Sequence, residues 1–181
     1  MKAKIKSFIP MIIFITGYPS SGKTSLAISL KKKLKKIGLN RLKYIDGDVF
    51  RKNQRLVKYD IKSRNLVGDK KIRFAKELIK LKKFVIVTGV AQDRLWRKKI
   101  KKKNKNLLEV FTKCPLKICK LRDYKKNYFK AKNRKIENFV GINYKYQEGK
   151  TVDLTLDMYK NSLKFNTNKL LKFLIKNKYV Y

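Results

Sequence analysis

One octapeptide constrains this chain more than any other part of its sequence: Gly17-Tyr18-Pro19-Ser20-Ser21-Gly22-Lys23-Thr24. It matches G-x-x-x-x-G-K-[ST], in which backbone N–H groups surround phosphate oxygens, the lysine reaches the β- and γ-phosphates, and the hydroxyl ligates Mg²⁺. A continuous apolar run, Met11–Thr16, precedes the motif, and an amphipathic stretch, Lys23–Ile37, follows it. Because a strand before and a helix after are the context that this motif requires, we predict a phosphate-binding loop (P-loop) that binds ATP and Mg²⁺.

The rest of the chain alternates apolar runs with amphipathic stretches. We expect further strands at Leu42–Ile45, Phe84–Thr88, Leu107–Thr112 and Val152–Leu156. Helices are predicted at Asp69–Leu81, Gln92–Lys102, Leu116–Asp123 and Thr167–Lys176. The first of these has a predicted buried stripe of Ile72, Phe74, Ala75, Leu78 and Ile79. Alternation of this kind predicts a three-layer α/β fold of the P-loop NTPase and kinase type, with a mostly parallel sheet of about five strands.

Residues 124–147 fit neither period, since they are polar, basic and aromatic together. We interpret this segment as a lid over the phosphate site. A chain of 181 residues is long enough to bury one good core, so we expect a single domain over residues 1–181.

The chain is strongly basic, with a formal net charge of +38. Such a charge is compatible with nucleic-acid binding, which would show as salt-dependent affinity for random duplexes. However, Lys outnumbers Arg by 41 to 9 and is scattered over nearly every predicted helix, whereas nucleic-acid readers favour Arg. We therefore interpret the lysines as solvated helix faces that steer an anionic substrate, and we do not expect nucleic acid as a partner.

Several other classes of site are excluded by composition. The chain has no His, which excludes His-based metal sites and acid–base pairs, and its cysteines, Cys114 and Cys119, lack the spacing of a zinc site or a disulfide framework. No segment is long enough to span a membrane. The apolar run near the start leads directly into the P-loop, so a cleaved signal peptide is not expected there, and we expect a cytoplasmic protein.

A pair of carboxylates follows the second predicted strand, in Asp46-Gly47-Asp48-Val49-Phe50-Arg51. The carboxyl ends of parallel strands form the crevice where α/β folds bind ligands. Either Asp46 or Asp48 could orient an acceptor hydroxyl as the catalytic carboxylate, while Thr24 and Asp48 are the candidate Mg²⁺ ligands. Arg51 could bind an anionic part of the substrate.

These motifs, taken with later ones, resemble the adenylylsulfate (APS) kinase family. The matching features are the P-loop, the Asp-Gly-Asp-x-x-Arg motif, Glu109-Val110-Phe111 through Pro115-Leu116 and Cys119 to Arg122-Asp123, the lid residues Tyr128 to Lys132, and Ile136, Asn138, Phe139, Gly141 and Ile142. The resemblance covers nearly the whole chain. It implies an ATP-dependent nucleotide kinase that phosphorylates the 3′-hydroxyl of APS in sulfate assimilation, with a homodimer as a candidate assembly.

The resemblance also implies roles for individual residues. ATP would be bound by Gly17 to Ser25 and by Arg122 against its base. Phe139 would stack on one side of the acceptor base, with Tyr59 as the candidate on the other side. Further acceptor-binding candidates are Arg51, Arg64, Lys130, Asn138, Gly141 and Ile142.

Two departures from the family pattern affect the acceptor. The family's R-x-x-N begins at Arg64 but has Val67 in place of Asn, and Ala91 replaces the Ser of F-I-S-P-Y-R. Lost polar contacts in one subsite favour a different ligand, so a related nucleotide such as cytidine diphosphoramidate, used in surface-polysaccharide synthesis, is an alternative acceptor. A shikimate- or gluconate-type kinase and a nucleic-acid-binding P-loop protein are further alternatives.

Overall fold

The computed structural model describes residues 7–53, 60–149 and 152–181. Its centre is a sheet of parallel strands in the order β2-β3-β1-β4-β5. The strands are β1 (Ile12–Thr16), β2 (Leu42–Ile45), β3 (Phe84–Thr88), β4 (Leu107–Lys113) and β5 (Leu154–Asp157). The predicted α/β fold with a mostly parallel sheet of about five strands is therefore confirmed.

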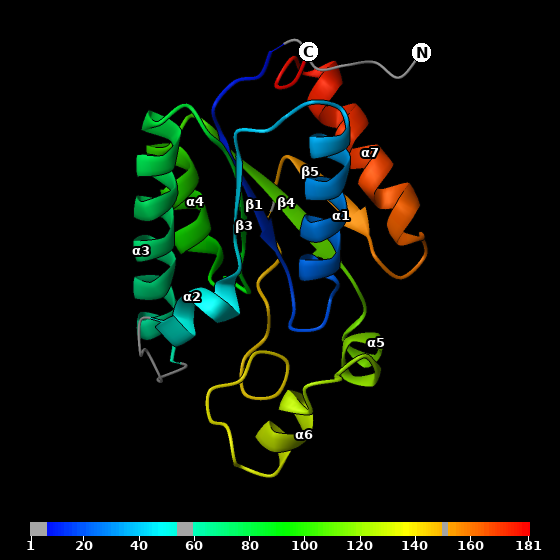
Figure 1. The fold of residues 1–181 in the computed structure, drawn as a ribbon. Helices are drawn as coiled ribbons and strands as arrows, with labels where there is room; N and C mark the ends of the chain where they lie inside the picture. Colours follow the sequence, from blue (N-terminus) through cyan, green and yellow to red (C-terminus); the bar gives the residue numbers. More distant parts are fainter. Residues whose placement is uncertain (1–6, 54–59, 150–151) are drawn as a thin grey trace.

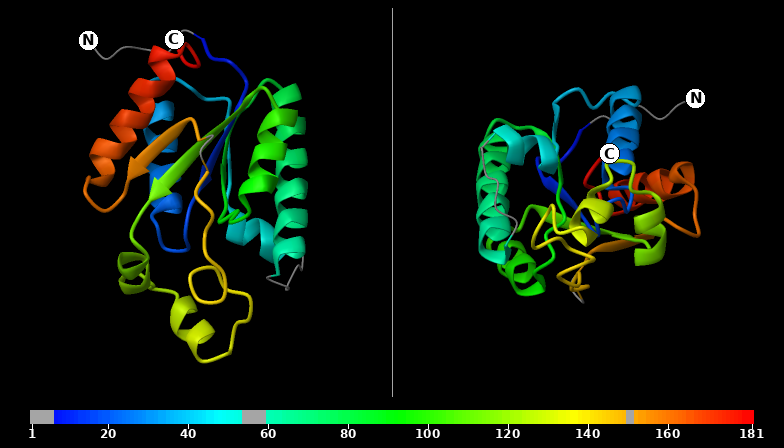
Figure 2. Two further views of the ribbon diagram at one scale, coloured as in Figure 1. Left: turned by 180° about the vertical axis from the view of Figure 1, so that it is seen from behind. Right: turned by 90° about the horizontal axis from the view of Figure 1, so that it is seen from below.

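Helices cover both faces of the sheet, as Figures 1 and 2 show. One face carries α1 (Lys23–Lys36) and α7 (Leu163–Lys176), and the other carries α3 (Ile61–Lys80) and α4 (Arg94–Lys103). Three short helices, α2 (Gly47–Asn53), α5 (Leu116–Leu121) and α6 (Asn127–Lys132), lie at the carboxyl edge of the strands. Within the described residues, no helix is both long and apolar enough to cross a membrane.

The central strands are buried on both faces, because alternate side chains pack into two separate hydrophobic cores. In β1, Ile13 and Ile15 pack among the residues beneath α1 and α7, whereas Ile12 and Phe14 pack beneath α3 and α4. All of these side chains are at most 2% exposed. Burial on both faces explains why the strands are continuous apolar runs in the sequence.

Helix α3 begins earlier than its sequence pattern predicted. The prediction placed its start at Asp69, but it begins at Ile61, where the Asp60 carboxylate accepts a hydrogen bond of 2.9 Å from the backbone N–H of Ser63. Such a cap satisfies one of the unpaired N–H groups at a helix start. The predicted stripe was also wrong in one member, because Phe74 is 44% exposed while Lys71 occupies a buried position.

The segment from Tyr124 to Gln147 lies beyond the carboxyl edge of the sheet, next to the loop that follows β1 (Figure 1). It contains α6, which its sequence did not predict, and a tight turn in which Gly141 has φ +97°. A Cβ atom at Gly141 would lie 2.8 Å from side-chain atoms of Leu116 and Tyr128. Only glycine fits that packing, which fixes the segment close to α5.

Candidate active site

The P-loop connects β1 to α1 at the carboxyl edge of the sheet. Its conformation depends on glycine, since Gly17 has φ +142° and Gly22 has φ +93°. A Cβ at Gly17 would also lie 2.3 Å from Oγ1 of Thr112. The Lys23 ammonium group donates hydrogen bonds to the carbonyl oxygens of Gly17 (3.1 Å) and Tyr18 (2.5 Å). The loop therefore surrounds the lysine and presents the start of α1 to a phosphate.

Burial lowers the pKa of Lys23 to about 8 from its ordinary value of 10.5, although the nearby Asp48 carboxylate raises it. A buried ammonium group that is solvated mainly by carbonyl oxygens is poorly stabilised. The negative charge of a bound phosphate would stabilise the charged form of Lys23. The site is accordingly prepared for an anion.

Asp46 is held by several neighbours at the end of β2. Its Oδ1 accepts hydrogen bonds from the backbone N–H groups of Asp48 (2.9 Å) and Val49 (3.2 Å), which begin α2. Its Oδ2 accepts hydrogen bonds from Tyr44 Oη (2.6 Å) and Thr24 Oγ1 (3.4 Å). This carboxylate therefore links the second strand directly to the threonine of the P-loop.

These hydrogen bonds also control protonation. Burial alone would raise the pKa of Asp46, but the hydrogen bonds from Tyr44, Val49 and Asp48 outweigh it and hold that pKa below its ordinary value. Conversely, burial and the bond to Asp46 raise the pKa of Tyr44 to about 12. Asp46 is therefore an anion and Tyr44 a neutral donor at neutral pH.

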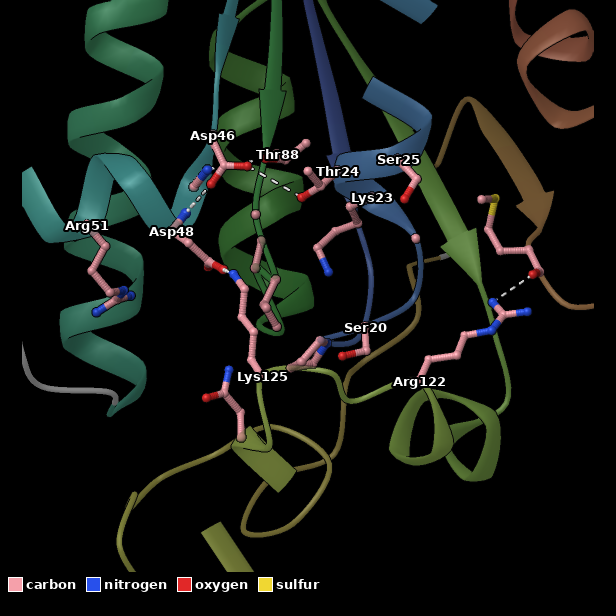
Figure 3. A pocket seen from close by; sticks show the side chains of 18 of the residues that line it. Ser20, Lys23, Thr24, Ser25, Asp46, Asp48, Arg51, Thr88, Arg122 and Lys125 are labelled. Carbon is pink, nitrogen blue, oxygen red and sulfur yellow. Dashed lines mark hydrogen bonds and ion pairs between the residues drawn. The ribbon is translucent and has the colours of Figure 1, made fainter. Parts of the chain in front are cut away.

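Asp48 is placed differently from Asp46. Its side chain is 75% exposed, and its Oδ2 accepts a hydrogen bond of 2.7 Å from Nζ of Lys125. Figure 3 shows Asp48 and Lys125 meeting on the side of the site toward Arg51, while Thr24 lies between Asp46 and Ser25. The two carboxylates therefore point to different neighbours although only Gly47 separates them.

A single cavity of about 1240 Å³ joins these groups. On one side it is bounded by Arg122 and by the residues from Met158 to Leu163 that follow β5. On the other side it is bounded by α2 with Arg51, by α3 with Arg64, by the loop after β3, and by Phe139 from the segment that follows α6. Lys23, Thr24 and the two carboxylates lie between the two sides, so the cavity has room for two ligands that meet there (Figure 3).

The cavity brings together most of the residues predicted from the sequence. Those that line it are Pro19, Ser20, Gly22, Lys23, Thr24, Ser25, Asp46, Asp48, Arg51, Arg64, Arg122 and Phe139. Arg122 donates a hydrogen bond of 3.0 Å to the carbonyl oxygen of Met158, which holds it on the side away from Arg51. Val67 and Ala91, the two departures from the family pattern, also line the cavity.

Other predicted residues lie outside its lining. Three of them belong to the P-loop but do not line the cavity: Gly17, Tyr18 and Ser21. The Tyr18 hydroxyl accepts a hydrogen bond from the N–H of Tyr146 (3.2 Å), and the Ser21 hydroxyl forms a hydrogen bond with that of Thr112 (2.7 Å). The remaining predicted residues outside the lining are Lys130, Asn138, Gly141 and Ile142, and Tyr59 lies outside the described residues.

One of these residues, Asn138, supports the cavity from outside its lining. Asn138 accepts a hydrogen bond of 3.1 Å from Arg64 through its carbonyl oxygen, and one of 2.9 Å from Tyr144 through its side chain. Phe139 itself is 5% exposed and meets the ring of Tyr128 edge-on, with centroids 5.0 Å apart. The turn that contains them thus positions Arg64 and Phe139 at the cavity wall.

Several site residues were not predicted from the sequence: Tyr44, Lys71, Thr88 and Lys125. The Thr88 hydroxyl accepts a hydrogen bond of 3.2 Å from the N–H of Gly47, which fixes the segment between the two acids. Lys71 had a detectable signal, because it falls within the apolar stripe of α3, between Gly68 and Ala75. A lysine at a core position of a helix marks a buried charge.

A parallel sheet with a P-loop after its central strand β1, and with paired acids after its edge strand β2 facing the same cavity, defines a P-loop kinase. A profile of the adenylylsulphate kinase family matches residues 9–157. The chain belongs to this family.

Individual relatives agree with this membership. The chain is 32% identical over 151 residues to a probable adenylyl-sulfate kinase of Archaeoglobus fulgidus, covering 83% of this chain and 97% of that protein. It is also 32% identical over 167 residues to the cytidine diphosphoramidate kinase of Campylobacter jejuni, covering 92% and 95%. The chain is thus similar to proteins that are named for two different acceptors.

The structure of the Mycobacterium tuberculosis APS kinase CysC in complex with AMPPNP and APS is similar over the same region. It superposes with a TM-score of 0.83 at 27% identity, covering 91% of this chain and 96% of that chain. The two proteins therefore share the same overall fold.

Proposed function

We propose that this protein transfers the γ-phosphoryl group of ATP to the 3′-hydroxyl of adenylyl sulfate. The observation that carries the proposal is the single cavity, in which the P-loop lysine and two carboxylates lie between two cation-bearing sides. The APS kinase of similar structure holds an ATP analogue and APS together. Family membership also argues against the shikimate- or gluconate-type alternative.

In this proposal, ATP occupies the side of the cavity bounded by Arg122 and by the residues after β5. The backbone N–H groups of the P-loop and the ammonium group of Lys23 hold its phosphates, and Arg122 lies against its base. Binding would exchange the carbonyl partners of Lys23, at Gly17 and Tyr18, for phosphate oxygens. A fixed cation at the transferred group stabilises the charge that spreads over it in the transition state.

The donor set beside the P-loop fits Mg²⁺, which prefers oxygen ligands and is held in kinase sites by one or two carboxylates together with substrate phosphates. Thr24 and Asp46 are the closest such pair, at 3.4 Å between Oγ1 and Oδ2, so we assign Asp46 to the metal side in preference to Asp48. When bound, Mg²⁺ neutralises charge on the β- and γ-phosphates. Asp48 then serves to orient the acceptor hydroxyl and accept its proton.

The acceptor occupies the opposite side. There Phe139 presents a ring to its base, for which stacking contributes about 1–3 kcal/mol, and Arg51 and Arg64 bring positive charge to its anionic groups. Lys130, Asn138, Gly141, Ile142 and Tyr59 belong to the same proposed acceptor region, with residues 124–147 as the lid that closes over it.

Cytidine diphosphoramidate is the second candidate acceptor, because of one structural observation. The family's polar residues near the acceptor anion are replaced by Val67, which is 2% exposed, and by Ala91, and both side chains line the cavity. An apolar wall cannot reproduce two hydrogen bonds, which changes the preference of a buried site among ligands.

The test is release of ADP from Mg·ATP, with adenylyl sulfate and cytidine diphosphoramidate in separate reactions and the phosphorylated product identified by mass spectrometry. We expect kcat/KM of at least about 10⁴ M⁻¹s⁻¹ for the true acceptor. Lys23→Ala, shown to be folded by circular dichroism, serves as the inactive control. Turnover that is independent of either nucleotide, or that persists in Lys23→Ala, would contradict the proposal.

A further inference from the structure

Lys71 is a buried lysine on the acceptor side of the cavity. Its side chain extends from α3, is 6% exposed, and lines the same cavity as the two carboxylates. Its Nζ donates a hydrogen bond of 3.1 Å to the carbonyl oxygen of Thr88, and it forms no ion pair within the part of the chain that the structure describes. An ammonium group has three N–H donors, so two are left for a ligand.

The surroundings of Nζ are kept open by two glycines. A Cβ atom at Gly89 would lie 2.7 Å from Nζ of Lys71, and one at Gly47 would lie 3.1 Å from it. Because Gly47 separates Asp46 from Asp48, the ammonium group lies beside the backbone that carries both acids. Lys71 is therefore close to the place where the acceptor hydroxyl must be oriented.

Part of the wall on this side is apolar. It includes Val67, Gly68, Ala91 and Trp96, and the indole N–H of Trp96 is already donated to Asp69, at 3.0 Å. An anionic group placed against these residues would therefore have the ammonium group of Lys71 as a hydrogen-bonding partner, in addition to Arg51 and Arg64 on the same side of the cavity.

The positive charge of Lys71 destabilises the ligand-free folded protein. Burial is the main cause that brings its pKa to about 8, below 10.5; Arg51 and Lys23 lower it further, while Asp48 and Asp46 raise it. A buried cation without a paired carboxylate destabilises a folded protein unless a ligand supplies the opposite charge. A purely structural role would be served better by an apolar side chain of similar length.

We propose that Lys71 recognises the acceptor by binding a tetrahedral anionic group, of the phosphate or sulfate type, that the acceptor carries in addition to its reacting hydroxyl. Lys71 thus takes over the contact that Val67 and Ala91 cannot make. The inference rests on the proposed function, and it makes Lys71 a determinant of acceptor specificity rather than of ATP binding.

The test compares Lys71→Met with Lys70→Met, which removes an exposed charge from the neighbouring position of the same helix. With the acceptor that wild type uses, adenylyl sulfate or cytidine diphosphoramidate, kcat/KM for the acceptor should fall about 10- to 100-fold in Lys71→Met, the usual effect of losing a charged hydrogen bond. The KM for ATP should change by less than about 2-fold, and Lys70→Met should resemble wild type. Lys71→Gln, which keeps a donor but not the charge, should lose nearly as much.

A second measurement does not need turnover. With AMPPNP filling the P-loop, inorganic sulfate should raise the Tm of wild type and Lys70→Met more than that of Lys71→Met. Failure of the proposed function would appear as wild type without acceptor-dependent ADP release, while this difference in Tm persisted. The inference itself is overturned if sulfate raises all three Tm values equally, or if Lys71→Met keeps the acceptor kcat/KM of Lys70→Met.

Discussion

Lys125 and Asp48 form an ion pair across the cavity, with 2.7 Å between Nζ and Oδ2, and both side chains are largely exposed (45% and 75%). Exposed ion pairs contribute about 0–1 kcal/mol to stability. Asp48→Asn should therefore leave the free energy of unfolding nearly unchanged. Its turnover should nevertheless fall about 10²- to 10⁴-fold, the range that general bases contribute. Steady-state kinetics and urea unfolding on the same preparation check both parts.

Lys125→Met is the matched control for this prediction, because it breaks the same ion pair from the other side. If Asp48 acts through its carboxylate on the acceptor, Lys125→Met should lose far less turnover than Asp48→Asn. Equal losses in the two variants would show that the ion pair, and not the carboxylate, is what the reaction requires.

Asp46 should behave unlike Asp48, because it supports the fold as well as the site. Asp46→Ala removes the acceptor of hydrogen bonds from Tyr44, Thr24, Asp48 and Val49. Loss of such a half-buried acceptor and helix cap typically costs about 1–2 kcal/mol. We therefore expect a lower urea midpoint together with lost activity, whereas an unchanged midpoint would mean that these bonds contribute nothing net.

The pH dependence of this effect has a definite sign. The pKa of Asp46 lies below its ordinary value in the folded protein, so its contribution is present above about pH 4, the ordinary aspartate pKa. It is lost as the pH falls further, through the folded-state pKa. The difference in stability between wild type and Asp46→Ala should shrink on acidification below about pH 4.

The strands and the P-loop could be predicted from the sequence because their signals are local. Each central strand is a continuous apolar run, and the loop has fixed glycine positions. The start of α3 could not be predicted, because a glycine such as Gly68 is unfavourable inside a helix. The reason for a glycine at this position is far away in the sequence: a Cβ atom at Gly68 would lie 2.3 Å from the ring of Trp96, in α4.

The candidate site was predictable to a similar extent. The acids after β2 and the cation at Arg122 belong to recognisable motifs, and the structure places them around one cavity. The difference between Asp46 and Asp48 was not predictable, since it depends on Tyr44 and Lys125, which approach from separate elements. Lysine is so common in this chain that Lys71, although it falls within the apolar stripe of α3, was recognised only from its burial.

Arg97 and Glu109 form a buried ion pair behind the site, with 2.7 Å between Nε and Oε1 and both side chains 2% exposed. Glu109 also accepts a hydrogen bond from Thr16, and Arg97 lies over the ring of Tyr146. Removing one partner of such a pair costs about 3–5 kcal/mol. Arg97→Met should therefore lower the urea midpoint strongly, more than the surface variant Arg73→Met.

The double variant Arg97→Met/Glu109→Gln provides the check on this pair. Because it leaves no uncompensated charge, it should recover part of the stability lost by Arg97→Met alone. Additive losses would show that packing, and not charge pairing, explains the effect.

Lys71→Met should raise the stability of the ligand-free protein, although it impairs acceptor binding. The pKa of Lys71 is about 8 in the fold against an ordinary 10.5, so below about pH 8 the folded protein bears the full cost of its buried charge, a difference of about 3 kcal/mol at 1.36 kcal/mol per pKa unit. Between pH 8 and 10.5 the unfolded chain binds more protons than the folded one, so the stability of wild type rises with pH relative to the variant.

Urea unfolding at pH 7 and at pH 10 should therefore show a free energy of unfolding that is much higher for Lys71→Met than for wild type at pH 7, and only slightly higher at pH 10. A variant less stable than wild type at pH 7 would mean that the ammonium group is already well compensated within the fold, and the case for a missing anionic partner would fail with it.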